Sequence, residues 1–131
     1  MSRYRILIAE DDPGTARLYQ SYAQRRGHEV LLARDGAETL LLAAAEAPDL
    51  ILLDVAMPKL DGRDVLKQLR GNARTARIPV LVVSAMAADA HLRSQLLELG
   101  ADDVLEKPVD LSGAFSRAER LAERARERSP T

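Results

Sequence analysis

Residues 6–14 read ILIAEDDPG, an apolar run of strand character that ends in three consecutive acids, Glu10, Asp11 and Asp12. Carboxylates this close repel one another, by roughly 4 kcal/mol for a pair about 4 Å apart at an effective dielectric constant of about 20. A cation bound at this point would remove the repulsion. Pro13 suits the first turn of a helix, so the stretch predicts a strand, an acidic turn and a helix in succession.

Apolar runs of strand character return four more times along the chain. The five runs are Arg5–Ala9, Glu29–Leu32, Leu50–Leu53, Val80–Val83 and Asp103–Leu105. Most of them do not alternate with polar residues, which is typical of strands covered on both faces. Segments of helical periodicity lie between them, and the longest apolar stripe, Leu111 to Ala125, suits a cover for the sheet or a heptad seam for a partner. This alternation predicts an α/β domain with a parallel sheet and helices on both faces.

Composition limits the class of protein. The chain has 131 residues with 19 basic and 20 acidic side chains, so no overall field draws it to nucleic acid or to a membrane. It has no cysteine, which excludes disulfides, zinc-thiolate sites and thiol nucleophiles and fits a reducing cytoplasm. The longest apolar run, Leu40–Ala45, is too short to span a bilayer, and the early acids do not suit a signal peptide. We therefore expect one soluble cytoplasmic domain over residues 1–128, followed by a polar tail, residues 129–131, that could begin a linker.

Polar residues follow the expected strands at the edge where parallel sheets bind ligands. The acids Glu10, Asp11 and Asp12 follow the first strand, and Asp54, Ser84 and Lys107 follow the third, fourth and fifth. If the strand order is 2-1-3-4-5, the first and third strands are neighbours and their carboxylates converge. Carboxylates suit a hard cation such as Mg²⁺, which prefers oxygen ligands.

These residues together suit acyl phosphate chemistry. Asp54 beside a metal ion is placed to attack a phosphorus atom and to hold the phosphoryl group as an aspartyl phosphate. The Lys107 ammonium and the metal would offset charge on the phosphoryl oxygens, and the Ser84 hydroxyl would donate a hydrogen bond to one of them. Each residue alone could be structural, and only their joint placement at four strand ends indicates a phosphoacceptor site.

The chain resembles the receiver domain of two-component response regulators. The resemblance rests on ILIAEDDPG, PDLILLDVAMPKLDG, IPVLVVSAMA and LGADDVLEKP, which occur in family order over nearly the whole chain. It implies a flavodoxin-like doubly wound (βα)5 fold with a five-stranded parallel sheet in the order 2-1-3-4-5. It also implies a signalling switch that catalyses only its own phosphorylation and dephosphorylation, with the phosphoryl group coming from a histidine kinase or phosphotransfer protein. An output domain or target protein that the sequence does not identify would read the switched surface, and the protein could form dimers.

The resemblance implies a role for each site residue. The metal ligands would be Glu10, Asp11, the phosphoacceptor Asp54 and the backbone carbonyl of Ala56. They would hold Mg²⁺, for which Mn²⁺ could substitute. Ser84 would be the switching hydroxyl, and Lys107 would pair with the phosphoryl group and precede a peptide bond to Pro108 that is usually cis. Asp12 falls outside this set and is expected to be a helix-start acid, favoured by the helix dipole.

The sequence departs from the family pattern at two positions. Val104 stands three residues before Lys107, where the family usually has an aromatic ring that moves inward on activation, and Val109 stands where an aromatic is common. The usual aromatic readout therefore cannot operate at position 104. The side chains of Ala56 and Met86, two residues after the phosphoacceptor and the switching hydroxyl, cannot orient a water, so we expect slow self-dephosphorylation.

Three rival functions remain open. Val104 alone favours a receiver-like module that binds partners without being phosphorylated. A phosphatase or mutase of the haloacid-dehalogenase type would need an acid two residues after the nucleophile, where this chain has Ala56. A flavodoxin-like cofactor carrier would need N–H donors and hydroxyls after the first strand, whereas the acids there would repel a phosphate.

A few other residues carry structural expectations. Asp35, with Glu38 three residues later, has the spacing of a capping box, and Asp110 is a candidate cap for the last helix. His28 lies in an expected turn and His91 on an expected helix face, and we expect both at the surface.

Overall fold

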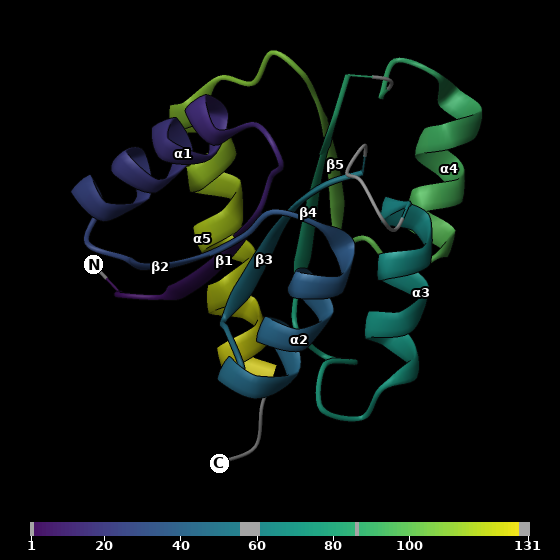
Figure 1. The fold of residues 1–131 in the computed structure, drawn as a ribbon, viewed down its shortest axis with the longest axis horizontal. Helices are drawn as coiled ribbons and strands as arrows, with labels where there is room; N and C mark the ends of the chain where they lie inside the picture. The colour runs from purple at the N-terminus through teal and green to yellow at the C-terminus, as the bar shows by residue number, and fades with distance from the viewer. Residues whose placement is uncertain (1, 56–60, 86, 129–131) are drawn as a thin grey trace.

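The structure, a computed structural model, describes residues 2–55, 61–85 and 87–128. Over these residues five strands alternate with five helices (Figure 1). The strands are β1 (Arg5–Ala9), β2 (Glu29–Ala33), β3 (Leu50–Asp54), β4 (Val80–Ser84) and β5 (Asp103–Glu106). The helices are α1 (Pro13–Arg25), α2 (Gly36–Glu46), α3 (Gly62–Gly71), α4 (Ala90–Glu98) and α5 (Leu111–Arg128).

All strand pairs are parallel and the strand order is β2-β1-β3-β4-β5, which confirms the predicted doubly wound fold. Four of the strands extend one residue beyond the predicted end, because ladder pairing continues to that residue. Asp54 pairs with Val83, and Ser84 pairs with Glu106. Asp54 and Ser84 are therefore the last residues of their strands, held by the sheet rather than by a loop.

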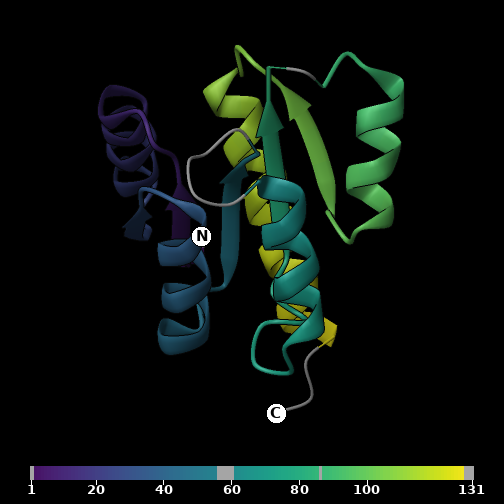
Figure 2. The same ribbon diagram turned by 45° about the vertical axis from the view of Figure 1, so that its right-hand side comes forward.

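The sheet lies between two helical layers, as Figures 1 and 2 show from two directions. Helices α1 and α5 cover one face, where Tyr19 and Phe115 are buried with Ile6 and Leu52. The other face is covered by α2, α3 and α4, with buried residues that include Ala43, Leu66 and Leu96. The apolar stripe of α5 packs on the sheet through Phe115, Ala118 and Ala122, so its role as a cover is confirmed.

Aspartates begin the helices next to the carboxyl end of the sheet. The Asp12 carboxylate accepts hydrogen bonds from the N–H and the hydroxyl of Thr15, at 2.9 and 2.6 Å. The Asp35 carboxylate accepts from the Glu38 N–H at 2.8 Å, and the Asp110 carboxylate accepts from the Gly113 N–H at 3.2 Å. These bonds confirm Asp35 and Asp110 as helix caps and Asp12 as a helix-start acid, because each carboxylate satisfies an N–H group in the first turn of its helix.

The start of α3 approaches the end of β3 very closely. A Cβ atom on Gly62 would lie 2.3 Å from the Cα atom of Val55, the residue after Asp54. The Gly62 N–H also donates to the Val55 carbonyl at 2.9 Å. Only glycine allows this approach, which fixes the backbone directly after the predicted phosphoacceptor.

His28 is buried, with 4 % of its surface exposed, so the expectation that it lies at the surface is wrong. Its Nδ1 accepts the Tyr4 N–H at 3.1 Å, which places the ring proton on Nε2, 2.7 Å from a carboxylate oxygen of Glu119. Glu119 also pairs with Arg26. The turn before β2 is covered by α5, a contact that local sequence does not reveal. His91 is exposed, as expected.

Candidate functional site

The carboxyl end of the sheet brings together side chains from four separate segments. Glu10 follows β1, Asp54 ends β3, Ser84 ends β4 and Lys107 follows β5. Glu10, Asp54 and Ser84 are 2 %, 7 % and 2 % exposed, so burial holds each of them in place. Parallel α/β sheets bind ligands at this edge, where the strand order reverses between β1 and β3.

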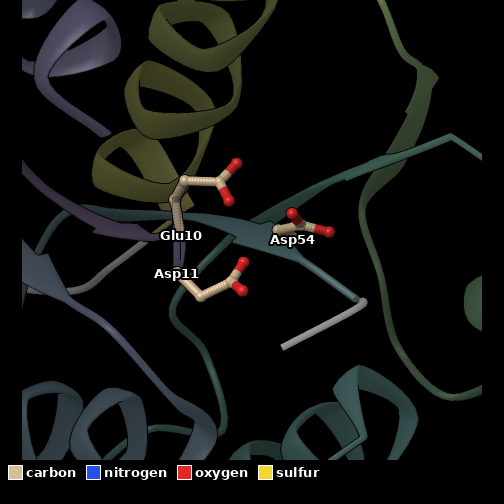
Figure 3. Close-up of side chains that lie close together, drawn as sticks. All are labelled: Glu10, Asp11 and Asp54. Carbon is tan, nitrogen blue, oxygen red and sulfur yellow. The ribbon is translucent and has the colours of Figure 1, made fainter. Parts of the chain in front are cut away.

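Three carboxylates face one another at this edge. One oxygen each from Glu10, Asp11 and Asp54 lie within 4.8 Å of one another, and Figure 3 shows the three side chains converging from β3 and the turn after β1. Asp11 is exposed to solvent while the other two are buried. This set of hard oxygen donors, open on one side, fits Mg²⁺, which keeps several waters in its octahedral shell.

Lys107 neutralises the two buried acids. Its Nζ donates to the Asp54 carboxylate at 2.8 Å and to the Glu10 carboxylate at 3.0 Å. Burial lowers the pKa of Lys107, but the hydrogen bonds to Asp54 and Glu10 outweigh it and leave that pKa above its usual value. Lys107 is therefore cationic at neutral pH.

Burial dominates the titration of Glu10. It raises the pKa of the Glu10 carboxyl above its usual value, against the lowering effect of the hydrogen bonds from Lys107 and from the Asp12 N–H. The Asp54 charge adds to the increase. The site thus holds a carboxylate at a cost in folding free energy, which a bound cation would reduce.

The backbone of Ser84 connects the site to two neighbouring segments. Its carbonyl accepts from the Lys107 N–H at 2.9 Å and from the Ala87 N–H at 3.4 Å. The end of β4 is therefore hydrogen-bonded both to the segment after β5 and to the segment before α4. The Lys107–Pro108 peptide bond is cis, as expected.

Asp12 takes no part in the acidic cluster. Hydrogen bonds from the side chain and the N–H of Thr15 hold the pKa of the Asp12 carboxyl below its usual value. The carboxylate is the N-cap of α1. The prediction that Asp12 is a helix-start acid is confirmed.

Val104 is fully buried in the core on the α4 side of the sheet. Its carbonyl accepts a hydrogen bond from the Arg93 guanidinium of α4 at 2.8 Å. Sequence reasoning missed Arg93, because nothing in its local pattern distinguishes it from a solvated helix arginine. Val109 packs against the core formed with α1 and α5.

Several expectations concern positions outside the described residues. These are the Ala56 carbonyl as a metal ligand, the Ala56 and Met86 side chains beside the hydrolytic water, and the tail at residues 129–131. Within the part of the chain that the structure describes, no helix is long and apolar enough to cross a membrane.

Comparisons with known proteins agree with this geometry. The family model described as response regulator receiver domain matches residues 6–119. The chain is 40 % identical over 120 residues to the DNA-binding dual master transcriptional regulator RpaA of Synechocystis, covering 92 % of this chain and 49 % of that protein. It is 38 % identical over 128 residues to the alkaline phosphatase synthesis transcriptional regulatory protein PhoP of Bacillus subtilis, covering 97 % of this chain and 52 % of that protein. The chain thus spans about half the length of these two relatives.

Solved structures show the same fold. The receiver domain of the Francisella response regulator 1452 is 31 % identical with a TM-score of 0.86, and the match covers 92 % of this chain and 98 % of that one. The receiver domain of the sensor histidine kinase PA1611 from Pseudomonas aeruginosa is 26 % identical with a TM-score of 0.85, covering 93 % of this chain and 99 % of that one. That receiver domain has a magnesium ion coordinated in its active site cleft.

Proposed function

Because the chain belongs to the response regulator receiver family, we propose that it accepts a phosphoryl group on Asp54 in a Mg²⁺-dependent reaction. The observation that carries the proposal is the meeting of three carboxylates and one ammonium at the edge of the sheet. Glu10, Asp11 and Asp54 would hold the ion, with the Ala56 carbonyl as a further ligand, and Mn²⁺ could replace Mg²⁺. Bound there, the cation would offset negative charge on the phosphoryl oxygens.

The reaction assigns a role to each side chain. An Asp54 oxygen attacks the phosphorus of a phosphohistidine or acyl phosphate, a P–O bond forms, and the bond from phosphorus to the donor breaks. The Lys107 ammonium, now 2.8 Å from the Asp54 carboxylate, would pair with a phosphoryl oxygen. The Ser84 hydroxyl would donate to another. The product is an aspartyl phosphate on the protein itself, so no metabolite is turned over.

Phosphorylation would then change what the surface binds. The aspartyl phosphate biases an equilibrium between two conformations, and a partner reads the difference between them. The donor would be a histidine kinase or phosphotransfer protein, and the reader an output domain, a target protein or a second copy of the chain. Residues 1–128 would form the receiver domain, with residues 129–131 as the start of a linker. The named relatives include a DNA-binding regulator, but this chain matches about half of its length, and we assign no nucleic-acid contact to the receiver.

The lifetime of the phosphoryl group follows from side-chain chemistry. Neither Ala56 nor Met86 could orient a hydrolytic water, so the aspartyl phosphate should persist for much longer than seconds at neutral pH. Following the loss of the phosphoryl mass with time after the donor is removed measures this directly. A lifetime of seconds would contradict the expected slow hydrolysis of the aspartyl phosphate.

A second function has one specific observation in its favour. Val104 fills a fully buried position, and no aromatic ring is available there to report the state of Ser84. A receiver-like module that binds partners without phosphorylation would show this feature. It would also fail to accept a phosphoryl group.

The experiment that separates the two functions is intact-mass spectrometry after incubation with acetyl phosphate. Wild type and Asp54→Asn are compared with Mg²⁺ and with EDTA, and Asp61→Asn, at an exposed helix cap, serves as a matched control. We expect one added phosphoryl mass on wild type and on the control, only with the metal. A folded wild type that binds Mg²⁺ but gains no mass would favour the unphosphorylated module.

A further inference from the structure

A cavity of about 720 Å³ lies at the opposite end of the sheet from Asp54. Its lining includes residues just before three strands, namely Asp49, Pro79 and Asp102. In Figures 1 and 2 the connection between α3 and β4 and the C-terminal end of α5 lie at this same end. We call it the arginine cavity, because five arginines line it: Arg70, Arg74, Arg77, Arg126 and Arg128.

Two of these arginines are already neutralised. The cavity has two carboxylates, and each has an arginine partner: Asp102 pairs with Arg70 at 3.0 Å, and Asp49 pairs with Arg126 at 3.4 Å. Arg70 also donates to three backbone carbonyls, so its structural role is clear. Arg126 in addition lies over the Tyr4 ring, 4.3 Å from its centroid.

The other three arginines have no such role. Arg74, Arg77 and Arg128 are exposed, and among the described residues none of them forms an ion pair. Five guanidinium groups and two carboxylates leave the lining with three excess positive charges, on a chain whose net charge is −1. A guanidinium presents a planar set of donors that matches the oxygens of a phosphate group. The cavity therefore suits a ligand that carries several negative charges close together.

The floor of the cavity is apolar. It includes the residues Pro48, Ile78, Pro79, Ala122 and Ala125. Ile78 and Ala122 are buried. The volume falls in the range of about 300–1,000 Å³ that small-molecule sites occupy. A ligand that fits has a charged end for the arginines and a flat, weakly polar part for the floor.

We propose that the arginine cavity binds a nucleoside di- or triphosphate, with the phosphates on Arg74, Arg77 and Arg128 and the nucleoside against the apolar floor. This site is separate from the phosphoacceptor site and does not depend on its function. A single nucleotide fits a cavity of about 720 Å³, whereas a nucleic acid backbone is tracked by a stripe of basic residues along a surface.

The test is isothermal titration calorimetry of the full chain with ATP, in EDTA and at low salt. Without a divalent ion the acidic site repels ATP, so binding there does not contribute. We expect saturable binding at one site, weakened at least about tenfold in the double variant Arg74→Gln/Arg77→Gln. The control, Arg25→Gln/Arg120→Gln, loses the same charge at exposed positions outside the cavity and should match wild type. Asp54→Asn should also match wild type, whatever its behaviour with acetyl phosphate.

Further probes test the two parts of the ligand. AMP should bind at least about tenfold more weakly than ATP if the arginines hold linked phosphates, and inorganic tripolyphosphate should bind more weakly than ATP if the floor holds the nucleoside. The proposal is overturned if ATP does not saturate, or if both double variants lose affinity equally. It is also overturned if AMP or tripolyphosphate binds as tightly as ATP, or if an oligonucleotide without terminal phosphates binds more tightly.

Discussion

At the scale of single residues, Lys107 supplies the positive charge that balances the buried carboxylates of the acidic site when no phosphoryl group is present. Its ammonium lies 2.8 Å from Asp54 and 3.0 Å from Glu10, so the protein supplies one cation to a cluster that would also bind another. Lys107 therefore stabilises the buried acids and, at the same time, would repel a metal ion bound beside them.

Removing this charge should separate the two effects. A divalent ion and an ammonium about 6 Å apart in a water-like dielectric repel by roughly 1.4 kcal/mol. We expect Lys107→Gln to bind Mg²⁺ about tenfold more tightly, yet to be phosphorylated more slowly by acetyl phosphate, because the phosphoryl oxygens lose their ammonium partner. Calorimetry and intact-mass time courses measure the two quantities. Lys67→Gln, at an exposed position, is the control, and weaker Mg²⁺ binding by the Lys107 variant would contradict the account.

Glu10 should show a conflict between stability and metal binding. Its raised pKa means that the folded state binds this proton more readily than the unfolded state does. The contribution of Glu10 thus favours folding below its unfolded pKa and is lost as the pH rises through the folded pKa. At pH 7 we expect Glu10→Gln to unfold about 3 °C higher, for a gain of about 1 kcal/mol, while it binds Mg²⁺ more weakly.

Thermal unfolding at pH 7 and at pH 4, without metal, measures this effect. The difference from wild type should shrink at the lower pH, because a larger fraction of Glu10 is protonated in both states there. Glu98→Gln, an exposed position on α4, should behave as wild type at both values. If Glu10→Gln is less stable than wild type at pH 7, the buried charge of Glu10 does not destabilise the folded protein.

At the scale of elements, the sheet determines where the chemical groups lie. Sequence periodicity predicts all five strands, but it ends four of them one residue early, because the hydrophobic pattern stops at Asp54 and Ser84 while the ladder continues through them. The caps were predictable because each depends on residues a few positions apart. The hydrogen bond of Arg93 was not predictable, since its acceptor, the Val104 carbonyl, is eleven residues away on another element.

The close approach of α3 to β3 gives a paired test within one helix. Gly62→Ala would place a Cβ atom 2.3 Å from the Val55 Cα, whereas Gly71→Ala meets nothing within 4 Å. We expect the first to destabilise the protein by more than about 2 kcal/mol, as overpacking against backbone does. The second should stabilise it by up to about 1 kcal/mol, as alanine does in place of helical glycine.

Urea denaturation of the two variants beside wild type measures both changes. Gly62→Ala should also slow phosphorylation of Asp54, because the backbone after the phosphoacceptor must shift. Equal stability of the two alanine variants would show that the approach seen at Val55 is not maintained in solution.

At the scale of the whole molecule, the last helix closes the fold against the first strand. Glu119 of α5 accepts from His28 at 2.7 Å and from Arg26 at 2.8 Å, and His28 in turn accepts the Tyr4 N–H just before β1. The succession of elements predicted a parallel sheet, and the family resemblance implied the strand order that the structure shows. This network was not predictable, because Glu119 is more than 90 residues from Arg26 and His28, and His28 has no local signal of burial.

The network should make stability depend on pH. Hydrogen bonds from Arg26, and then from His28, hold the pKa of Glu119 below its usual value. The stabilisation that Glu119 provides is thus fully present above the pKa that Glu119 has in the unfolded state. It is lost as the pH falls through the pKa that Glu119 has in the folded state. We expect Glu119→Gln to lower the free energy of unfolding by about 1–3 kcal/mol at pH 7. The variant should also lose less stability than wild type as the pH falls. Glu123→Gln, exposed on the same helix, is the matched control.

Urea denaturation between pH 7 and pH 3 measures that dependence for wild type and both variants. The curves of wild type and Glu119→Gln should converge at the acid end. If the curves of unfolding free energy against pH stay parallel, the hydrogen bonds from Arg26 and His28 do not lower the pKa of Glu119.

Chemical trapping at residue resolution would identify the residue that carries the phosphoryl group, which we propose to be Asp54. Wild-type protein phosphorylated by acetyl phosphate with Mg²⁺ is reduced with borohydride, which converts an aspartyl phosphate to homoserine, and the peptides are sequenced by tandem mass spectrometry. We predict homoserine at position 54 and unmodified aspartate at positions 11 and 12. Homoserine at either of those positions, or at none of the three in a protein that has gained the phosphoryl mass, would rule out Asp54 as the single phosphoacceptor.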